Sequence, residues 1–377
     1  MNLRRLWAIA RKEFIHILRD PRSLGLAIAI PMLLLVMFGY ALTLDVDHVP
    51  LVIWDQDETP VSRELISRFL GSRYFGLFAY AQNYREVEHA IDTRDALVAL
   101  VVPRGFGGQI DAGRTGAAQL IVDGSDANTA TLAAGYADAV AQTYSQDVTL
   151  RVARRLGASG LAPPLDVRPR VWFNTDMESK NFIVPGLIAI IMMVITALLT
   201  SLTVAREWER GTMEQLISTP IKGPELIFGK LLPYFVIGMF NVTLAVLMGE
   251  FLFHVPLRGS IPLLFGMSAI FLLGVLSLGV FISVVAKNQL MANQLAMLIT
   301  FLPTFLLSGF IYAIANMPKP IQVITHIIPA RYFIALLRGI YLKGVGLKVM
   351  MVDAVFLTVF GVLMVVLANL KSKKKLV

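Results

Sequence analysis

Six long apolar stretches constrain this chain more than any other feature of its sequence. Each is about as long as the 20 or so residues that an α-helix needs to cross about 30 Å of hydrocarbon. They lie near 24–44, 182–204, 228–250, 261–286, 290–312 and 350–370. Composition agrees, because 56% of the 377 residues are hydrophobic and only 16% are charged. We therefore predict a polytopic α-helical membrane protein with six transmembrane helices.

Charge is distributed unevenly along the chain. The segment from Asp45 to Glu178 carries 12 Arg and 18 acidic residues, whereas the rest carries 22 basic and 8 acidic residues. Excess Lys and Arg beside apolar spans marks the cytoplasmic side of a membrane protein. Such residues flank the first span, follow the second span and end the chain, so we expect both termini in the cytoplasm. No basic stripe with interleaved aromatic residues is present, which argues against a nucleic-acid partner.

The first 44 residues are predicted to contain two different helices. Within 1–22, apolar residues recur at helical spacing opposite Arg and Lys, which is typical of an amphipathic helix on the inner membrane surface. Asp20-Pro21 ends that helix. The apolar run in 23–44 is longer than the core of a signal peptide and is predicted to be a retained transmembrane helix.

Residues 45–180 leave the membrane and are predicted to form an extracytoplasmic α/β domain inserted between the first and second spans. The predicted strands are 50–54, 76–81, 96–102, 119–122 and 167–173, and the predicted helices are 60–70, 83–92, 104–112 and 127–156. Two polar clusters resemble metal-ligand sets: Asp45, Asp47 and His48, and Asp123 with Asp126. We interpret both as turn and helix-capping residues and expect no metal site.

The remainder, 181–377, is predicted to form five helices of the bundle with a cytoplasmic loop at 205–225. In that loop Gly211 suits a helix end, Thr212 and Gln215 have capping-box spacing, and Pro220 stops a second, short helix. A charged loop that holds a short amphipathic helix is typical of a docking element. On the local pattern alone, a solvated connector between two spans is an equally good interpretation.

Three stretches resemble type-2 permeases of ATP-binding-cassette (ABC) exporters, most closely the drug-exporter branch. They are the N-terminal Lys12-Glu13 with Arg19-Asp20-Pro21-Arg22, the loop from Arg206 to Pro220 with Gly229-Lys230-Leu231-Leu232-Pro233, and the segment from Ser308-Gly309-Phe310 through Pro329-Ala330-Arg331 to Arg338-Gly339-Ile340. With the order of one span, a large outer domain and five spans, the resemblance covers essentially the whole chain.

The resemblance implies partners and site residues. It implies a homodimer or heterodimer of permeases in a bacterial cytoplasmic (inner) membrane, bound to separate ATPase subunits and in some systems to a periplasmic adaptor. It implies that the helix around 206–219 enters a cleft of the ATPase. The coupling residues would be Arg206, Glu207, Glu209, Arg210, Gly211, Thr212 and Glu214.

A second prediction concerns the outer segment and the polar residues within the spans. The stretches 320–329 and 331–342 are apolar but too short to cross, so the region 313–345 is predicted to be re-entrant. Few polar groups lie deep in the spans, and these are the candidates for lining a transport path: Asn241, Asn293, Gln294, Thr300 and Thr304. Hydrogen bonding between helices is an equally good role for each of them.

The chain is not expected to be an enzyme. An intrinsic ATPase needs a glycine-rich phosphate loop, but Gly223 and Gly229-Lys230 have the wrong spacing and Leu231 replaces the hydroxyl residue. No nucleophile-and-base constellation or metal-ligand set is apparent, and cysteine is absent. No cofactor is therefore expected in this chain, and ATP and Mg²⁺ would be bound by the partner subunit.

The leading functional hypothesis is efflux of a hydrophobic or amphiphilic molecule, drug-like or lipid-like, driven by a separate ATPase. An ion-coupled secondary carrier would place charged residues within its spans, which are almost free of them. A membrane sensor with an extracytoplasmic ligand-binding domain would need a cytoplasmic output module, and only short loops and a Lys-rich tail are available. The sequence does not identify the substrate.

Overall fold

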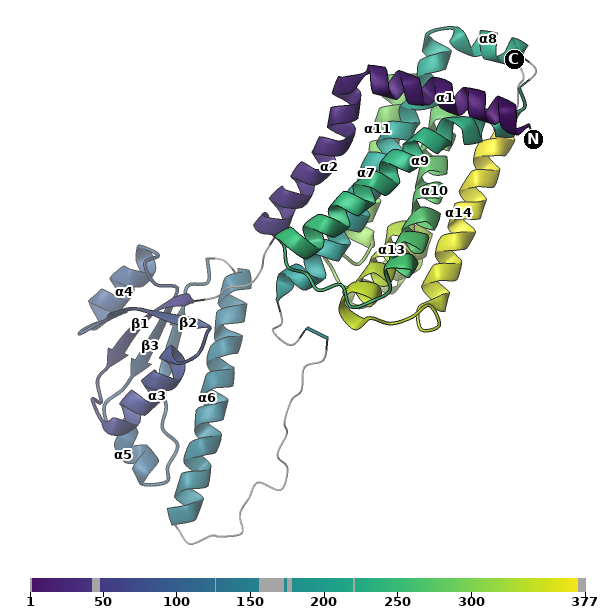
Figure 1. Cartoon of the computed structure of the whole chain (residues 1–377). Helices are drawn as coiled ribbons and strands as arrows, with labels where there is room; N and C mark the ends of the chain where they lie inside the picture. The colour runs from purple at the N-terminus through teal and green to yellow at the C-terminus, as the bar shows by residue number, and fades with distance from the viewer. Residues whose placement is uncertain are drawn as a thin grey trace. The chain divides into compact units, whose positions relative to one another are not determined.

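The computed structural model describes residues 2–42, 48–125, 127–155, 173–174, 178–219 and 221–371. The chain divides into two compact units, one made of Met1–Thr43 with Val171–Val377 and the other of Leu44–Arg170. The first unit is helical and the second contains a β-sheet (Figure 1). Each has a hydrophobic core of its own.

The helical unit contains α-helices joined by short 3-10 and π-helical segments. Its α-helices are α1 (Leu3–Arg19), α2 (Pro21–Ala41), α7 (Ser179–Glu209), α8 (Thr212–Ser218), α9 (Gly223–Leu247), α10 (Ile261–Ala286), α11 (Gln289–Leu307), α12 (Lys319–Ile324), α13 (Pro329–Arg338) and α14 (Met351–Lys371). The shorter segments are the π-helical η1 (Met248–Leu252) and η4 (Gly339–Lys343) and the 3-10 turns η2 (Ile314–Asn316) and η3 (Thr325–Ile327).

Most of the predicted spans coincide with helices that are able to cross a bilayer. Among the described residues, five helices are long and apolar enough: Ser179–Glu209, Gly223–Leu252, Ile261–Ala286, Gln289–Leu307 and Met351–Lys371. They correspond to the second to sixth predicted spans. The first predicted span is covered by α2, whose described apolar stretch is the shorter Ala27–Ala41. A polytopic membrane protein is therefore confirmed, and the count of six stays a prediction.

The predicted re-entrant segment is a sharply bent helix pair. Lys319–Ile327 and Pro329–Lys343 meet at 87°, and the break falls at Ile328, the residue before Pro329. A residue before proline is pushed towards extended backbone, and Ile328 has φ −87° and ψ 111°. Broken spans and re-entrant loops share this bent geometry, so the re-entrant placement stays a prediction.

Helix α7 forms the centre of the helical unit. It packs against α2, α9, α10, α11 and α13, and the most apolar window of α7 is 72% buried. The corresponding windows of α11 and α14 are only 22% buried, so these helices lie at the periphery. Close approach of α7 and α10 depends on Gly279, because a Cβ there would lie 2.0 Å from the Thr200 hydroxyl oxygen.

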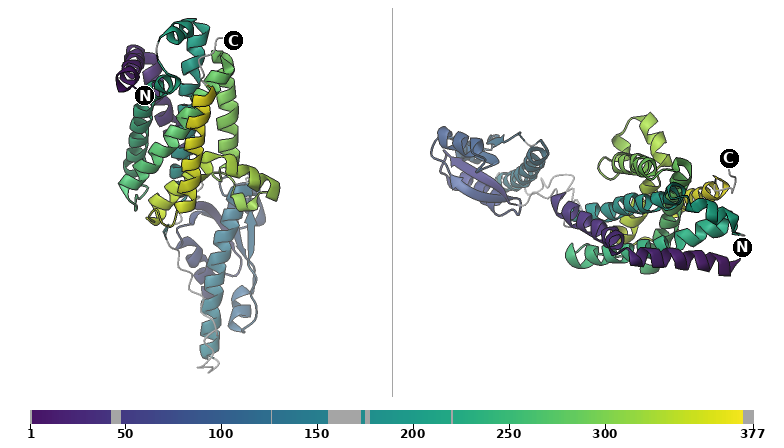
Figure 2. Two further views of the ribbon diagram at one scale, coloured as in Figure 1. Left: turned by 90° about the vertical axis from the view of Figure 1, so that its right-hand side faces the viewer. Right: turned by 90° about the horizontal axis from the view of Figure 1, so that it is seen from above.

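The long helices of this unit run antiparallel to their neighbours in sequence, whereas α1 lies across one end of the bundle (Figures 1 and 2). Helix α8, the start of α1 and the end of α14 lie at that same end (Figure 1). Helix α2 ends, and α7 begins, at the opposite end. The bundle therefore has one end with α1 and α8 and another end at which α2 ends and α7 begins.

Arg338 fixes the bent helix pair to the bundle. Its Nη1 donates to the Gly309 carbonyl at 3.1 Å, and its Nε donates to the Phe182 carbonyl at 3.3 Å. The guanidinium also lies 3.4 Å from the centre of the Phe182 ring, which adds a cation–π contact. One side chain thus links α13, the first turn of α7 and the chain just after α11.

The inserted unit is a four-stranded sheet with helices on both faces. Strands β1 (Val49–Asp55), β2 (Phe75–Tyr80) and β3 (Val98–Val102) are parallel, β4 (Gln119–Val122) is antiparallel, and their order is β2-β1-β3-β4. The helices are α3 (Pro60–Leu70), α4 (Tyr84–Asp92), α5 (Phe106–Asp111) and α6 (Ala127–Arg155). These elements agree with the predicted ones to within about two residues. The fifth predicted strand, 167–173, lies outside the described residues except for Phe173, which is in a bend.

The two faces of the sheet are covered differently. Alternate residues such as Val49, Leu51 and Ile53 are fully buried against α3, α5 and α6. The opposite face, with Val52 and Ala99, packs on the single short helix α4. Successive side chains of β1 point to opposite faces of the sheet, so its buried residues alternate between the two cores.

Candidate functional site

The end of the bundle with α1 and α8 is where charged side chains are concentrated and buried. Helix α7 ends at Glu209, Arg210 keeps helical backbone as its C-cap, and Gly211 has φ +69°. This left-handed conformation costs glycine least, as the sequence predicted. Thr212 then begins α8, and its hydroxyl donates back to the Glu207 carbonyl at 3.3 Å. The turn between α7 and α8 is thus fixed by Gly211 and Thr212.

Helix α1 is held against α9 by close packing. Ile9 is 6% exposed and packs with Met213 of α8 and Leu226 of α9. A Cβ on Gly229 would lie 2.8 Å from the Ile9 Cβ and 3.1 Å from the Leu6 carbonyl oxygen. Only glycine at this position therefore allows the two helices to approach so closely.

A second contact secures the start of α1. Glu225 is 1% exposed, and its Oε1 accepts from the backbone N–H of Asn2 at 2.6 Å. The other oxygen, Oε2, accepts from the backbone N–H of Lys222 at 3.0 Å. One carboxylate thus satisfies free backbone donors at the N-termini of α1 and α9.

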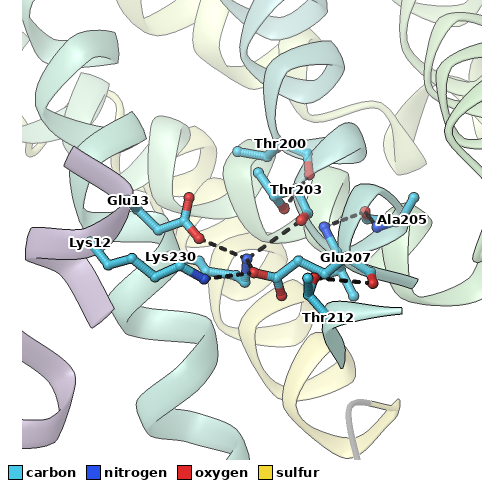
Figure 3. Close-up of polar contacts among 10 residues, drawn as sticks. Lys12, Glu13, Thr200, Thr203, Ala205, Glu207, Thr212 and Lys230 are labelled. Carbon is cyan, nitrogen blue, oxygen red and sulfur yellow. Dashed lines mark hydrogen bonds and ion pairs between the residues drawn. The ribbon is translucent and has the colours of Figure 1, made fainter. Parts of the chain in front are cut away.

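The most unusual feature is a buried cluster of ionised side chains, the ion cluster, made of Lys12, Glu13, Glu207 and Lys230 (Figure 3). The Nζ of Lys230 lies 2.9 Å from Glu13 Oε1 and 2.9 Å from Glu207 Oε1, and it donates to the Thr203 carbonyl at 3.4 Å. Lys12 Nζ lies 3.3 Å from Glu207 Oε1. The cluster therefore joins α1, α7 and α9.

Burial makes the ion cluster energetically demanding. The side chains of Lys230, Glu13 and Glu207 are 2%, 8% and 10% exposed, whereas Lys12 is 59% exposed. Two carboxylates and two ammonium groups balance in charge, as buried ions require. Removing one partner of such a group leaves an uncompensated buried charge and costs about 3–5 kcal/mol. The three helices are thus constrained to keep their relative positions at this end.

The opposite side of α7 is bound to the turn between α10 and α11. Glu209 accepts from the backbone N–H of Gln289 at 2.8 Å and also from its side-chain amide. Arg206 Nε donates to Gln289 Oε1 at 3.3 Å, and Lys287 lies 5.1 Å from the centre of the Trp208 ring. The last turn of α7 is therefore held between α1 and α9 on one side and this turn on the other.

Comparison with known proteins identifies the family. A family model described as "ABC-2 family transporter protein" matches residues 22–370. The chain belongs to the ABC-2 transporter family. Its predicted resemblance to type-2 ABC permeases is thereby confirmed.

Individual relatives of this ABC-2 family protein cover it almost completely. It is 39% identical over 377 residues to the "Probable multidrug ABC transporter permease YbhS" of Escherichia coli K12, spanning 100% of this chain and 98% of that protein. It is 31% identical over 347 residues to "Probable multidrug ABC transporter permease YbhR" of the same strain, with 92% of each chain covered. It is 24% identical over 363 residues to "Linearmycin resistance permease protein LnrN" of Bacillus subtilis, covering 91% and 92%.

In this ABC-2 permease the predicted coupling residues have different environments. Glu207 lies in the ion cluster, and Arg206 and Glu209 contact Gln289. Gly211 and Thr212 form the turn, while Arg210 and Glu214 are exposed. The predicted capping box differs in detail, because the Thr212 hydroxyl bonds to Glu207 of α7 rather than capping α8. Pro220 lies outside the described residues.

The predicted path-lining residues of this permease do not gather in one place within the chain. Asn241 is 3% exposed and its amide donates to the Ala27 carbonyl at 3.0 Å. Thr300 donates to the Ala296 carbonyl at 2.6 Å, and Thr304 contacts the Met193 sulfur at 3.0 Å. Asn293 and Gln294 lie on the exposed face of α11. The Asn241 and Thr304 contacts fit helix-to-helix bonding, whereas the Thr300 bond lies within α11, and a role in a transport path stays a prediction.

The polar clusters of the inserted unit behave as turns where they are described. Asp123 accepts from the backbone N–H of Ser125 at 2.9 Å and from its hydroxyl at 2.6 Å. Asp45, Asp47 and Asp126 lie outside the described residues. Within the part of the chain that the structure describes, no group of three or more His, Cys, Asp or Glu side chains is placed to hold a metal ion.

Sequence reasoning about this permease missed Glu13, Lys230 and Gln289 as parts of one site. Lys230 was part of the Gly229-Lys230-Leu231-Leu232-Pro233 resemblance and of the rejected phosphate-loop match, and neither use assigned it a charged partner. A signal was available, because a lysine seven residues into an apolar helix, directly after a glycine, indicates a buried charge that needs a partner. Nothing in the sequence indicated which carboxylates would supply that partner.

Proposed function

We propose that this chain is the permease subunit of an ABC exporter that moves a hydrophobic or amphiphilic molecule, drug-like or lipid-like, out of the cytoplasm or the inner leaflet. The supporting observation is the ion cluster, which ties the segment from α7 to α8 to both α1 and α9. A force applied to α8 would reach three helices of the bundle through buried contacts. The names of the relatives YbhS and YbhR support a drug-like cargo.

The energy is proposed to come from a separate ATPase that binds ATP and Mg²⁺. Helix α8 is the proposed docking element, since Met213 anchors it to the bundle while Glu214 and Gln215 are exposed. The exposed Arg210 and Glu214 would supply charged contacts to the ATPase. This arrangement favours a docking element over a solvated connector, because the adjoining turn of α7 is fixed on two sides.

The proposed location is a bacterial cytoplasmic membrane, with the end formed by α1 and α8 in the cytoplasm and the α/β unit outside. Support comes from the amphipathic α1, whose outer face exposes large apolar side chains suited to an interfacial helix: Leu3, Trp7, Phe14 and Leu18. The basic residues of α1 and the end of α14 at Lys371 lie at the same end of the bundle. This distribution follows the positive-inside rule.

The functional unit is proposed to be a dimer of permeases, with identical or different partners, bound to two ATPase subunits. The low burial of α11 and α14 leaves broad apolar surfaces for lipid or a second permease. A periplasmic adaptor would contact the α/β unit. Membership in the ABC-2 family supports the ATPase partner.

The decisive test of this proposal is a charge reversal on α8. In a complex reconstituted with its ATPase, Glu214→Lys is expected to lower transport-coupled ATP hydrolysis several-fold while insertion stays normal, because Glu214 is exposed. Lys348→Glu reverses an exposed charge in the loop at the opposite end and serves as the matched control. Glu207→Lys is unsuitable, because it would place another cation beside the buried Lys230.

Two results would overturn the proposal. One is equal ATPase activity and equal transport in the wild type, Glu214→Lys and Lys348→Glu. The other is cargo accumulation by the chain alone in liposomes under a pH or sodium gradient, which would indicate an ion-coupled carrier.

A further inference from the structure

A row of exposed side chains follows the outer face of α1, on the side of the helix away from the ion cluster. Its members are spaced alternately three and four residues apart, so each is the neighbour of the next on the helix surface. We refer to the row as the α1 ridge, and it consists of Arg4, Trp7, Arg11, Phe14 and Leu18. Trp7, Phe14 and Leu18 are 62%, 41% and 54% exposed, and both arginines are exposed as well.

The two arginines of the α1 ridge have no counter-charge among the residues that the structure describes. Neither the Arg4 nor the Arg11 guanidinium makes a hydrogen bond or an ion pair to a described residue. The single acidic residue in the sequence of α1 is Glu13, which is turned into the bundle and lies 2.9 Å from the Nζ of Lys230. The exposed surface of α1 therefore carries positive charge that this helix does not neutralise.

Charged and apolar side chains alternate along the α1 ridge, and this alternation indicates the kind of partner. On the helix surface Trp7 lies between Arg4 and Arg11. A dissolved anion would bind the arginines and leave the rings of Trp7 and Phe14 in water, whereas an apolar protein surface would leave the guanidinium groups unpaired. An anionic lipid leaflet satisfies both, because its phosphates bind guanidinium groups and its interface accommodates aromatic rings.

We propose that the α1 ridge binds the head groups of anionic phospholipids in the inner leaflet, with Arg4 and Arg11 on lipid phosphates and Trp7 in the interface between them. The two arginines are about 10 Å apart along the helix axis, which leaves one phosphate position on each side of Trp7. A zwitterionic head group brings an ammonium group that offsets the attraction, so the ridge selects lipids with net negative charge. The inference rests on the proposed location of α1 at the inner membrane surface and adds the lipid class that α1 selects.

The test measures which lipid lies against α1 in the full-length permease. The chain contains no cysteine, so Ala8→Cys provides a single labelling site, at an exposed position next to Trp7. The labelled protein is placed in nanodiscs of equimolar phosphatidylglycerol and phosphatidylcholine, with bromine near the head-group end of the chains of one lipid or the other. Bromine quenches a fluorophore at short range, so the ratio of the two quenching values gives the composition beside the label.

With the native ridge, the lipid beside the label is expected to be enriched about fivefold in phosphatidylglycerol, the factor that one basic side chain near an anionic surface contributes. Arg11→Gln is expected to lower the enrichment, and Arg4→Gln with Arg11→Gln to abolish it. Lys371→Gln, which removes one exposed positive charge at the same end of the bundle, is the matched control and is expected to leave the enrichment unchanged. Arg4→Lys with Arg11→Lys keeps the charge and is expected to keep most of the enrichment, which a structural role of the arginines would not predict.

The outcomes separate the inference from the proposed location. Equal quenching by the two lipids would overturn the inference but leave α1 at the membrane, whereas quenching by neither lipid would contradict the location itself. Undiminished enrichment in the folded double glutamine variant would assign the preference to other basic residues. Soluble glycerophosphoglycerol, the head group without chains, is expected not to reduce the enrichment at matched ionic strength; a reduction would show that the arginines bind a free phosphate ester. Loss of all quenching on addition of the ATPase would show that the ridge is a protein-docking surface.

Discussion

Lys230 and its two carboxylate partners set the strongest constraint at the level of single residues. The 2% exposed ammonium group balances Glu13 and Glu207, which lie on different helices. Water cannot replace Lys230 at this depth, so each carboxylate depends on it. The same contacts that the proposed coupling uses are therefore also needed for folding of this end of the bundle.

Replacing Lys230 with Met should destabilise the helical unit by about 3–5 kcal/mol, because the buried Glu13 would lose its cation and Glu207 would keep only the exposed Lys12. The expected observation is a lower thermal midpoint of the purified chain in detergent. Lys319→Met removes an exposed lysine and should leave the midpoint unchanged. Adding Glu13→Gln to Lys230→Met should recover part of the loss. Equal midpoints for Lys230→Met and Lys319→Met would show that the ion cluster contributes no stability.

Asp57 joins two loops at the edge of the α/β unit's sheet where ligands usually bind. In parallel sheets, ligands bind beyond the carboxyl ends of the strands where the strand order reverses, here between β1 and β3. At that position Asp57 accepts from the backbone N–H groups of Gly105 at 2.7 Å and Gly107 at 2.8 Å. A Cβ on Gly107 would lie 2.6 Å from the Thr59 hydroxyl. At this edge the backbone N–H groups of Gly105 and Gly107 are therefore already bonded to Asp57.

The same contacts predict acid sensitivity of the α/β unit. The Thr59 hydroxyl and the N–H groups of Gly105 and Gly107 lower the pKa of Asp57. A carboxyl whose pKa is lower in the folded state adds stability above its unfolded pKa of about 3.9, and that stability is lost as pH falls through the folded value. Hydrogen-exchange protection of residues 98–112, corrected for intrinsic rates, should therefore be higher at pH 6 than at pH 3.

Asp57→Asn provides the control for this pH effect. The variant should show weaker protection of residues 98–112 at pH 6, by about 1–3 kcal/mol, because the amide cannot accept both backbone bonds. Its protection should also change less between pH 6 and pH 3. If the wild type and the variant had the same pH dependence, other carboxyl groups would be responsible.

At the level of helices and strands, the sequence was sufficient wherever a repeating pattern set the structure. Period-two alternation located β1 to β4, and long apolar runs located α7, α9, α10, α11 and α14. Gly211 marked the end of α7, because the left-handed backbone there, with a φ of +69°, favours glycine. These features depend only on residues that are close in the sequence, so the sequence alone is enough to locate them.

Helix α1 illustrates what the sequence could not provide. Its apolar residues were predicted to form one membrane-facing stripe, but the structure uses two faces. Trp7 is 62% exposed on the outer face, while Ile9 and Glu13 are 6% exposed and point into the bundle. The inner face is defined by Gly229 and Lys230, more than 200 residues away in the chain. Amphipathic spacing predicts a helix, whereas its partner depends on tertiary packing.

The ion cluster was unpredictable for the same reason. It combines α1, α7 and α9, and the sequence distances between these helices carry no information about contact. Asn241 was predicted to line a path or to bond to another helix, and the structure shows the bond, to Ala27 of α2. The residue types indicated that the buried charged and amide side chains needed bonding partners, but not which residues would supply them.

For the whole molecule, the division into two units implies that they fold independently. The sheet core around Leu51 and Ile53 shares no residue with the core of the helical unit. Helix α2 ends, and α7 begins, at the same end of the bundle, so a short connection between them is geometrically simple. Removing residues 44–170 should therefore leave the bundle, with its ion cluster, intact.

In one variant, a flexible Gly-Ser linker replaces residues 44–170. We expect this variant to insert into membranes and to have a thermal midpoint within a few degrees of that of the full chain, since distant sites contribute additively. The sharper test combines this deletion with Lys230→Met. If the units are independent, the substitution should lower the thermal midpoint by the same amount in the full and shortened chains. A larger effect in the shortened chain would mean that the α/β unit supports the ion cluster. In that case the inserted unit would be part of the coupling machinery rather than an accessory to it.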